Sequence, residues 1–141
     1  MSTPQLVPYL TFNGTCQEAM TFYQQCLGGE LMLQRFADTP AAERVAADAQ
    51  QNIMHSILTT DTFTLMASDS GMGTVARGTM MSLSLNCHSP EQIQELFGKL
   101  SADGTVTMPL EDTFWGATFG ILIDRFGIDW MLNYDKPAAQ Q

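Results

Sequence analysis

The side chain with the widest chemical range in this sequence is that of His55, one of two histidines. An imidazole accepts and releases protons near neutral pH, so His55 is a candidate general base. Strand alternation places Ile57 and Thr59 on its face, which should look into a cup-shaped site. A structural histidine is the competing interpretation, and it is favoured because no carboxylate is evident nearby to orient the ring. His88, at the start of a predicted helix, is interpreted as a solvated side chain.

Three methionines form a second candidate group. Met66, Met80 and Met131 lie on predicted strands, on the faces that alternate with the buried ones. Thioethers are soft and polarizable, which suits a wall that contacts irregular apolar or aromatic ligands. Methionine is also an ordinary core residue, and the chain contains 10 of them. A ligand-binding lining and core packing therefore stand as equal alternatives.

Aromatic residues extend this candidate site. Trp115 and Phe119 lie where the mouth of a cup is expected, and they would be stacking walls if exposed, whereas Trp130 is predicted to face a helix in the core. The predicted ligand-binding set is Tyr9, Met66, Met80, Trp115, Phe119, Met131 and Asn133.

Two arginines and two cysteines each have a functional and a structural interpretation. Arg35 and Arg77 could hold an anionic group through their bidentate guanidinium, but surface ion pairs are the favoured alternative. Cys16 and Cys87 occur near predicted helix starts, where the pKa of a thiol can fall, yet buried, inert thiols are favoured. Asp69, at the end of its strand, is expected to tie down the loop around Gly71.

Composition bounds the class of protein. A chain of 141 residues with 45% hydrophobic residues is long enough for one ordinary domain. The formal net charge of −9 repels phosphate backbones and anionic lipids, which excludes nucleic acid and membranes as expected partners. The start of the chain resembles no signal peptide and no apolar run could span a bilayer, so we expect a cytoplasmic protein. Three cysteines without a CxxC pair argue against a disulfide framework or a zinc site.

The sequence repeats itself at an offset of 73 residues. The segment at residues 10–13 reappears at residues 83–86, and each copy precedes a stretch with the apolar spacing of an amphipathic helix. Both helices are predicted to begin with a capping box, Thr15 with Glu18 and Ser89 with Gln92. They are predicted to end at Gly28-Gly29 and at Asp103-Gly104.

Each predicted helix is preceded by one strand and followed by three, which gives a βαβββ pattern twice. Residues 38–51 are predicted to form a short helix or a mobile loop, and residues 70–78 a loop. The fold class is therefore α+β, with a first module over residues 6–68 and a second over residues 79–135. The predicted strands are residues 6–12, 30–36, 53–60, 63–68, 79–86, 105–110, 118–124 and 128–134.

Alternation along these strands predicts one buried and one open face for each sheet. In the last strand, Ile128, Trp130 and Leu132 share the face that a helix should cover, while Met131 and Asn133 lie on the other. Two curved sheets of this kind would each present a half-polar concave face. Such a face is a cup that suits a small molecule.

The chain resembles the PhnB-like branch of the vicinal oxygen chelate superfamily, which also contains glyoxalase I, extradiol dioxygenases and the fosfomycin and bleomycin resistance proteins. The most specific part of the match is FGILIDRFGIDWMLN at residues 119–133. Further matching segments are VPYLTFNGTCQEA at residues 7–19, Phe22-Tyr23, Met54-His55-Ser56, LMASD at residues 65–69 and Phe114-Trp115-Gly116.

This resemblance implies one glyoxalase-like domain over residues 1–141, a homodimer, and a ligand cavity in each cup. Metal-using relatives place four ligands at positions that correspond here to Val7 or Tyr9, Met66, Met80 and Met131. None of these is a histidine or a carboxylate, so we expect no metal and no cofactor. In many relatives the position of Ile57 is acidic, which weakens a catalytic role for His55 further.

Two functions remain open. The first is a metal-free binding protein, which could sequester an antibiotic or metabolite as the bleomycin resistance relatives do. The second is an enzyme that acts on a small molecule through His55, or through a metal bound at unexpected positions such as Asp129. The name 3-demethylubiquinone methyltransferase is attached to some members of this branch. The sequence offers it little support, because its one Gly-x-Gly, at residues 71–73, lacks the context of a nucleotide-binding turn.

Overall fold

The protein is described by a computed structural model that covers residues 3–71 and 73–137. Parts of two predicted features, the start of the chain and the Gly-x-Gly loop, lie outside the described residues, which omit 1–2, 72 and 138–141. The chain divides into two compact units, residues 1–76 and 77–141, and each is described by itself. Among the described helices, none combines the length and apolar character needed to cross a membrane.

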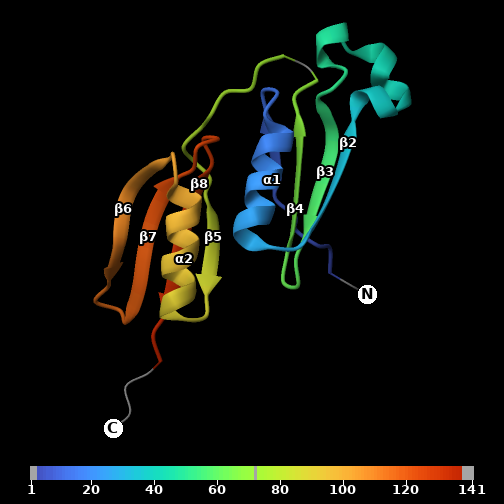
Figure 1. The fold of residues 1–141 in the computed structure, drawn as a ribbon. Helices are drawn as coiled ribbons and strands as arrows, with labels where there is room; N and C mark the ends of the chain where they lie inside the picture. The colour runs from blue at the N-terminus through green and yellow to red at the C-terminus, as the bar shows by residue number, and fades with distance from the viewer. Residues whose placement is uncertain (1–2, 72, 138–141) are drawn as a thin grey trace. The chain divides into compact units, whose positions relative to one another are not determined.

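The first unit has one helix against one four-stranded sheet (Figure 1). The strands lie in the order β1-β4-β3-β2, with β1 parallel to β4 and the other pairs antiparallel. Three 3-10 helices connect β2 to β3, so of the two alternatives for residues 38–51, a short helix or a mobile loop, the structure has the first, in 3-10 form. The elements are β1 (Tyr9–Phe12), α1 (Cys16–Leu27), β2 (Glu30–Arg35), η1 (Phe36–Asp38), η2 (Pro40–Arg44), η3 (Ala47–Ala49), β3 (Ile53–Thr59) and β4 (Thr64–Asp69).

The second unit repeats this plan with the strand order β5-β8-β7-β6, and its edge strand β5 is again parallel to its neighbour, β8 (Figure 1). Its elements are β5 (Leu83–Cys87), α2 (Pro90–Ser101), β6 (Thr105–Asp112), β7 (Ala117–Ile123) and β8 (Asp129–Asp135). The predicted α+β arrangement of two βαβββ modules is therefore confirmed.

The core of each unit lies between its helix and one face of its sheet. In the first unit the face that α1 covers includes Leu58, Leu65 and Ala67, all at most 2% exposed. In the second unit Trp130 and Leu132 are buried in the same way, as their alternation predicts. Burial of such side chains is the main favourable contribution to folding, at roughly 1.5 to 3 kcal/mol for each large aliphatic residue.

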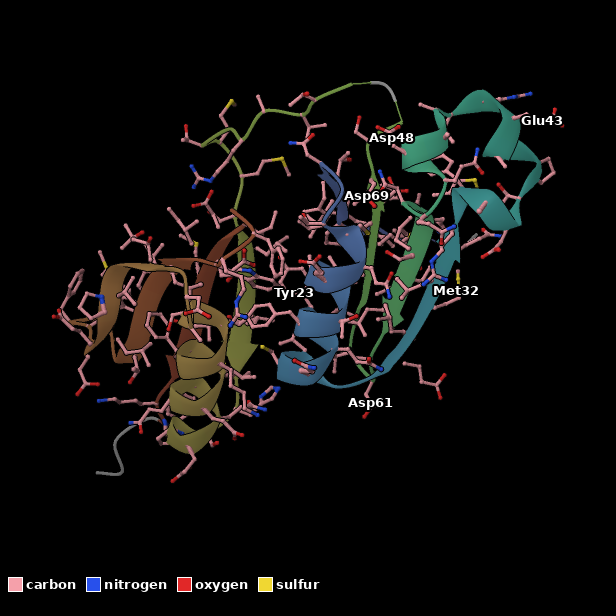
Figure 2. All side chains as sticks on the ribbon, turned by 45° about the horizontal axis from the view of Figure 1, so that its top comes forward. Tyr23, Met32, Glu43, Asp48, Asp61 and Asp69 are labelled. Atoms are coloured by element: carbon pink, nitrogen blue, oxygen red, sulfur yellow. The ribbon has the colours of Figure 1, made fainter. Side chains whose placement is uncertain are left out.

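The two helices begin in different ways. Helix α2 has the predicted cap at Ser89, whose hydroxyl accepts a hydrogen bond of 3.0 Å from the Gln92 amide. The Gln92 side chain reaches back as predicted, but it accepts its hydrogen bond of 2.7 Å from the amide of His88 rather than from that of Ser89. Helix α1 lacks the predicted side-chain cap at Thr15. The buried carboxylate of Asp69, at the end of β4, replaces it (Figure 2).

Several predicted strand boundaries were wrong, each for a reason of pairing, and one helix ends earlier than predicted. Strand β1 begins at Tyr9 rather than at residue 6, because its first partner is Met66. Strand β5 begins at Leu83 rather than at residue 79, because its pairing with β8 begins with Leu83 opposite Trp130. Strand β6 continues to Asp112, past bulges around Pro109, and α2 ends at Ser101.

Candidate functional site

The open face of the first sheet carries a row of apolar side chains. The strand register aligns one residue from each strand, and these residues alternate with the buried ones that contact α1. Tyr9 and Met32 at the two ends of the row are 49% and 43% exposed, and the two central side chains are half-buried. Figure 2 marks Met32 on β2. The row consists of Tyr9, Met66, Ile57 and Met32.

His55 belongs to the next row of the same face, where Gln34 is its partner across β2 and β3. Its Nδ1 lies 3.4 Å from the Tyr9 hydroxyl, and the two rings are stacked with centroids 6.0 Å apart. Within residues 3–71 and 73–137, no carboxylate is hydrogen-bonded to His55. A histidine in this position can exchange a proton with a ligand, but the side chain hydrogen-bonded to its ring, among the residues that the structure describes, is a phenol.

The open face of the second sheet holds the remaining predicted strand residues. Met131 lies between Ser84 and Ile121 in the register, and Asn133 lies between Asn86 and Phe119. The Asn133 amide also donates to the carboxylate of Asp135 at 3.0 Å. Both predicted residues are therefore on the face that α2 leaves uncovered.

An aromatic chain leads from the β6–β7 turn onto this second face. Phe114 is 97% exposed, and its ring packs edge-on against that of Trp115 at 4.9 Å. The Trp115 ring in turn lies 6.3 Å from that of Phe119. Trp115 is 57% exposed, as it must be if its ring is to stack on a ligand.

The predicted position of Met80 on a strand was wrong. It precedes β5 in an irregular segment and is 97% exposed, as is its neighbour Met81 at 83%. The alternation of residues 79–86 imitates a strand, but the first four of these residues have no partner in β8. Met80 therefore does not line the sheet beside Met131.

The two arginines are engaged in interactions with the protein. The guanidinium of Arg77 is 2.7 Å from the Asp129 carboxylate and also donates to the Gly127 carbonyl at 2.8 Å, so the ion-pair interpretation is confirmed for it. Arg35 donates to the side-chain oxygen of Gln17 on α1, at 3.4 Å, and thus lies on the helix side of the sheet. Arg35 is therefore not directed onto the open face of the first sheet.

The family positions do not fit a hard or borderline cation. Tyr9, Met66 and Met131 offer a phenol and two thioethers, which are poor ligands for magnesium, manganese or zinc. Asp129, the carboxylate that could have anchored a metal, is already paired with Arg77. In the part of the chain that the structure describes, no three His, Cys, Asp or Glu residues come close enough together to hold one ion.

The cysteines and Asp69 have structural environments. All three cysteines are buried. Burial raises the pKa of the Cys16 thiol to about 11, against a smaller lowering by the hydrogen bond to Ser56, and burial also raises the pKa of Cys87. Asp69 accepts the amides of Gly14, Cys16 and Ile53, each at 2.9 Å, so the expectation that it holds the Gly71 loop was wrong.

A groove in the second unit, of about 770 Å³, was not predicted. It lies between the first turns of α2 and residues of β6, β7 and β8. An ion pair of 2.9 Å between Asp112 and Lys136 borders it. The hydrogen bond with Lys136 lowers the pKa of the Asp112 carboxyl, and the hydrogen bond with the Thr118 hydroxyl lowers it further. Its lining is Pro90, Gln94, Leu110, Glu111, Asp112, Thr118, Tyr134, Lys136 and Pro137.

Two βαβββ units, each with a helix on one face and an open sheet on the other, define a protein of the glyoxalase and bleomycin resistance fold. A solved structure of a glyoxalase-related enzyme from Fulvimarina pelagi has the same fold, with a TM-score of 0.63 over 94% of this chain and 89% of its own. Its sequence identity of 18% limits this likeness to the fold.

The chain belongs to the family described as 3-demethylubiquinone-9 3-methyltransferase, whose family model matches residues 4–133. Protein PA1353 from Pseudomonas aeruginosa is 42% identical, with a TM-score of 0.86 over 96% of this chain and all of its own. A putative 3-demethylubiquinone-9 3-methyltransferase, PhnB protein, from Bacillus cereus is 28% identical, with a TM-score of 0.78 over 93% and 99% of the two chains. Protein YjdN of Escherichia coli is 31% identical over 96% and 99%.

Proposed function

We propose that the protein binds a small apolar or aromatic molecule on the open faces of its sheets. The observation that carries this proposal is the row of partly exposed side chains Tyr9, Met66, Ile57 and Met32. An apolar row next to a few polar groups is the usual composition of a small-molecule site. Methionines suit this role because their flexible thioethers adapt to the shape of a ligand.

Binding on this face does not use the metal of the metal-using relatives. The residues that replace the metal ligands are themselves apolar, so they add contact area where those relatives coordinate an ion. Met131, Phe119, Trp115 and Asn133 extend the same proposal to the second sheet. Elemental analysis of gently purified protein tests this part, since stoichiometric nickel, zinc, manganese or iron would contradict it.

A thermal-shift screen against metabolites and antibiotics tests the proposed function directly. A ligand present at a hundred times its Kd stabilises the folded state by about 2.7 kcal/mol, which shifts the melting temperature measurably. We expect Met66→Gln to abolish the shift and Met81→Gln to retain it, because both change the same residue type but only Met66 lies in the row. A library without a single stabilising compound, or equal shifts in both variants, would count against binding at this face.

A second candidate function, proton transfer by His55, is favoured by the contact between its Nδ1 and the Tyr9 hydroxyl. A compound that stabilises the protein is incubated with it and analysed by mass spectrometry. Turnover that is lost in His55→Gln while binding persists would make the protein an enzyme. An unchanged compound leaves binding as the function.

We also propose that the chain forms a homodimer in the cytoplasm. Each sheet has two edge strands, β1 and β2 in one and β5 and β6 in the other, and pairing across a two-fold axis is a common way to protect such edges. Three cysteines without a CxxC pair suit a reducing compartment. Light scattering is the test of the dimer, because a mass of 15.5 kDa at working concentration would be that of the monomer.

A further inference from the structure

The open face of the first sheet is divided into an apolar row and a polar row. Along each strand, residues two positions apart point the same way and lie about 6.6 Å from each other. Met32 is therefore followed by Gln34 on β2, Met66 by Ser68 on β4, and Tyr9 by Thr11 on β1, while Ile57 on β3 adjoins His55. The two rows are Met32, Ile57, Met66 and Tyr9, and Gln34, His55, Ser68 and Thr11.

The polar row offers hydrogen bonds without a fixed charge. A hydroxyl, an amide and an imidazole can each donate to or accept from an oxygen or nitrogen of a ligand. The nearest strand arginine, Arg35, is turned to the helix side, where it donates to Gln17. Of the strand residues on this face, only Glu30 at the edge of β2 has a carboxylate, and it is exposed.

The unit that carries this face has a net negative charge. Residues 1–76 contain two arginines, no lysine and seven Asp or Glu residues, which gives a formal charge of −5 with histidine neutral. The second sheet differs, because Arg77 brings a guanidinium to Asp129 beside its open face. The net charge of the unit therefore disfavours an anionic group on the first face, where none of the described strand residues that point outward is a lysine or an arginine.

We infer that the first sheet binds an uncharged aromatic molecule with hydrogen-bonding groups at one end, and discriminates against anions of the same shape. The flat part contacts the sulfur atoms of Met32 and Met66 and the Tyr9 ring, since thioethers make favourable contacts with aromatic rings. The polar end meets the row of Gln34, His55, Ser68 and Thr11. This inference rests on the proposed function and adds the class of ligand to it.

Two fluorescent probes with the same scaffold test the inference on the full chain. N-phenyl-1-naphthylamine is uncharged, and 8-anilinonaphthalene-1-sulfonate adds a single negative group to the same ring system. We expect the uncharged probe to bind at least about tenfold more tightly at low ionic strength, where charges are least screened. Met32→Gln, at a partly exposed position, should weaken its binding about fivefold, whereas Met81→Gln should leave it within twofold.

A charge placed on the face provides the reverse test. Gln34→Arg should raise the affinity for the sulfonate about five- to tenfold and lower the preference for the uncharged probe by at least the same factor. Gln25→Arg, on the exposed side of α1, makes the same change in net charge away from the face and should alter neither.

The possible failures are distinguishable. If neither probe binds and no library compound stabilises the protein, the proposed function itself fails. If both probes bind equally and Met32→Gln weakens both, binding at the face stands and the class of ligand is overturned. If the uncharged probe binds unchanged to Met32→Gln, its site lies elsewhere and the inference is also overturned.

Discussion

The carboxylate of Asp69 accepts a hydrogen bond of 2.9 Å from the backbone amide of Cys16, which lies 53 residues earlier in the chain. The same side chain accepts the amides of Gly14 and Ile53, so one buried group joins the start of α1, the start of β3 and the end of β4. A helix start leaves several backbone amides without an internal partner, and a carboxylate is the strongest acceptor that a side chain can offer them.

Replacement of Asp69 should therefore destabilise the first unit strongly. We expect Asp69→Ala to lower the free energy of unfolding by about 3 kcal/mol, because buried amides lose their acceptor. The stability of Asp69→Asn should fall between that of the unchanged protein and that of Asp69→Ala. Urea denaturation followed by circular dichroism measures this. Asp61→Ala, in the exposed β3–β4 turn, is the matched control and should stay within about 0.5 kcal/mol. Equal stabilities of the two alanine variants would contradict the role of Asp69.

The buried Cys16 thiol predicts a loss of stability in alkali. Its pKa is about 11 in the folded protein against 9.0 for an ordinary cysteine thiol, so between these values the unfolded chain has released a proton that the folded chain retains. Stability is then fully present below pH 9 and falls by about 1.4 kcal/mol for each pH unit up to 11. Urea denaturation at pH 8 and pH 10.5 should show the decline, and Cys16→Ala should reduce it. An identical decline in that variant would refute the assignment.

The two tryptophans should report opposite environments. The Trp130 indole is 2% exposed and donates to Asp124 at 2.8 Å, whereas Trp115 is 57% exposed. Trp115→Phe should leave a blue-shifted emission that acrylamide quenches poorly, and Trp130→Phe a red-shifted emission that is quenched well. We also expect Trp130→Phe to cost about 2 kcal/mol, since the Asp124 oxygen loses a buried donor. Similar quenching of both variants would argue against this arrangement.

Two glycines of the second unit should respond to alanine with opposite signs. A Cβ on Gly120 would lie 2.7 Å from the Phe97 ring and 2.9 Å from Leu110, so Gly120→Ala should cost about 1 to 3 kcal/mol through overpacking under α2. Gly98 lies within α2 with open space around it, and Gly98→Ala should stabilise by about 0.5 to 1 kcal/mol because alanine favours the helix. Thermal unfolding of both variants checks this, and a stabilising Gly120→Ala would be incompatible with the close packing.

The sequence was most informative where signals are local or periodic. The internal repeat and the alternation of Trp130 with Met131 predicted both modules and the buried faces of their sheets. The cap of α2 could be recognised because the residues that form its hydrogen bonds lie within five positions, from His88 to Gln92. The capping role of Asp69 could not be recognised, since nothing near it in the chain indicates that its partners are Gly14 and Cys16.

The candidate site was only partly predictable for a related reason. Tyr9, Met66 and Met131 were assigned to open faces by alternation alone, and the strand register places them there. Met80 shows the limit of this approach, because an alternating pattern forms a strand only where a partner strand is present. The contact between His55 and Tyr9 joins residues 46 apart and required the structure. The binding roles of these residues stay predictions until a ligand is tested.

The different starts of the two helices also matter for protein synthesis. A nascent chain that has not yet reached Asp69 carries α1 without the acceptor for its first amides, so this end of the helix can be completed only after most of the first unit has left the ribosome. The start of α2 needs only residues up to Gln92, so it can be completed as soon as that residue has left the ribosome. During translation, completion of the helix start is thus delayed in the first module, whereas it is not delayed in the second.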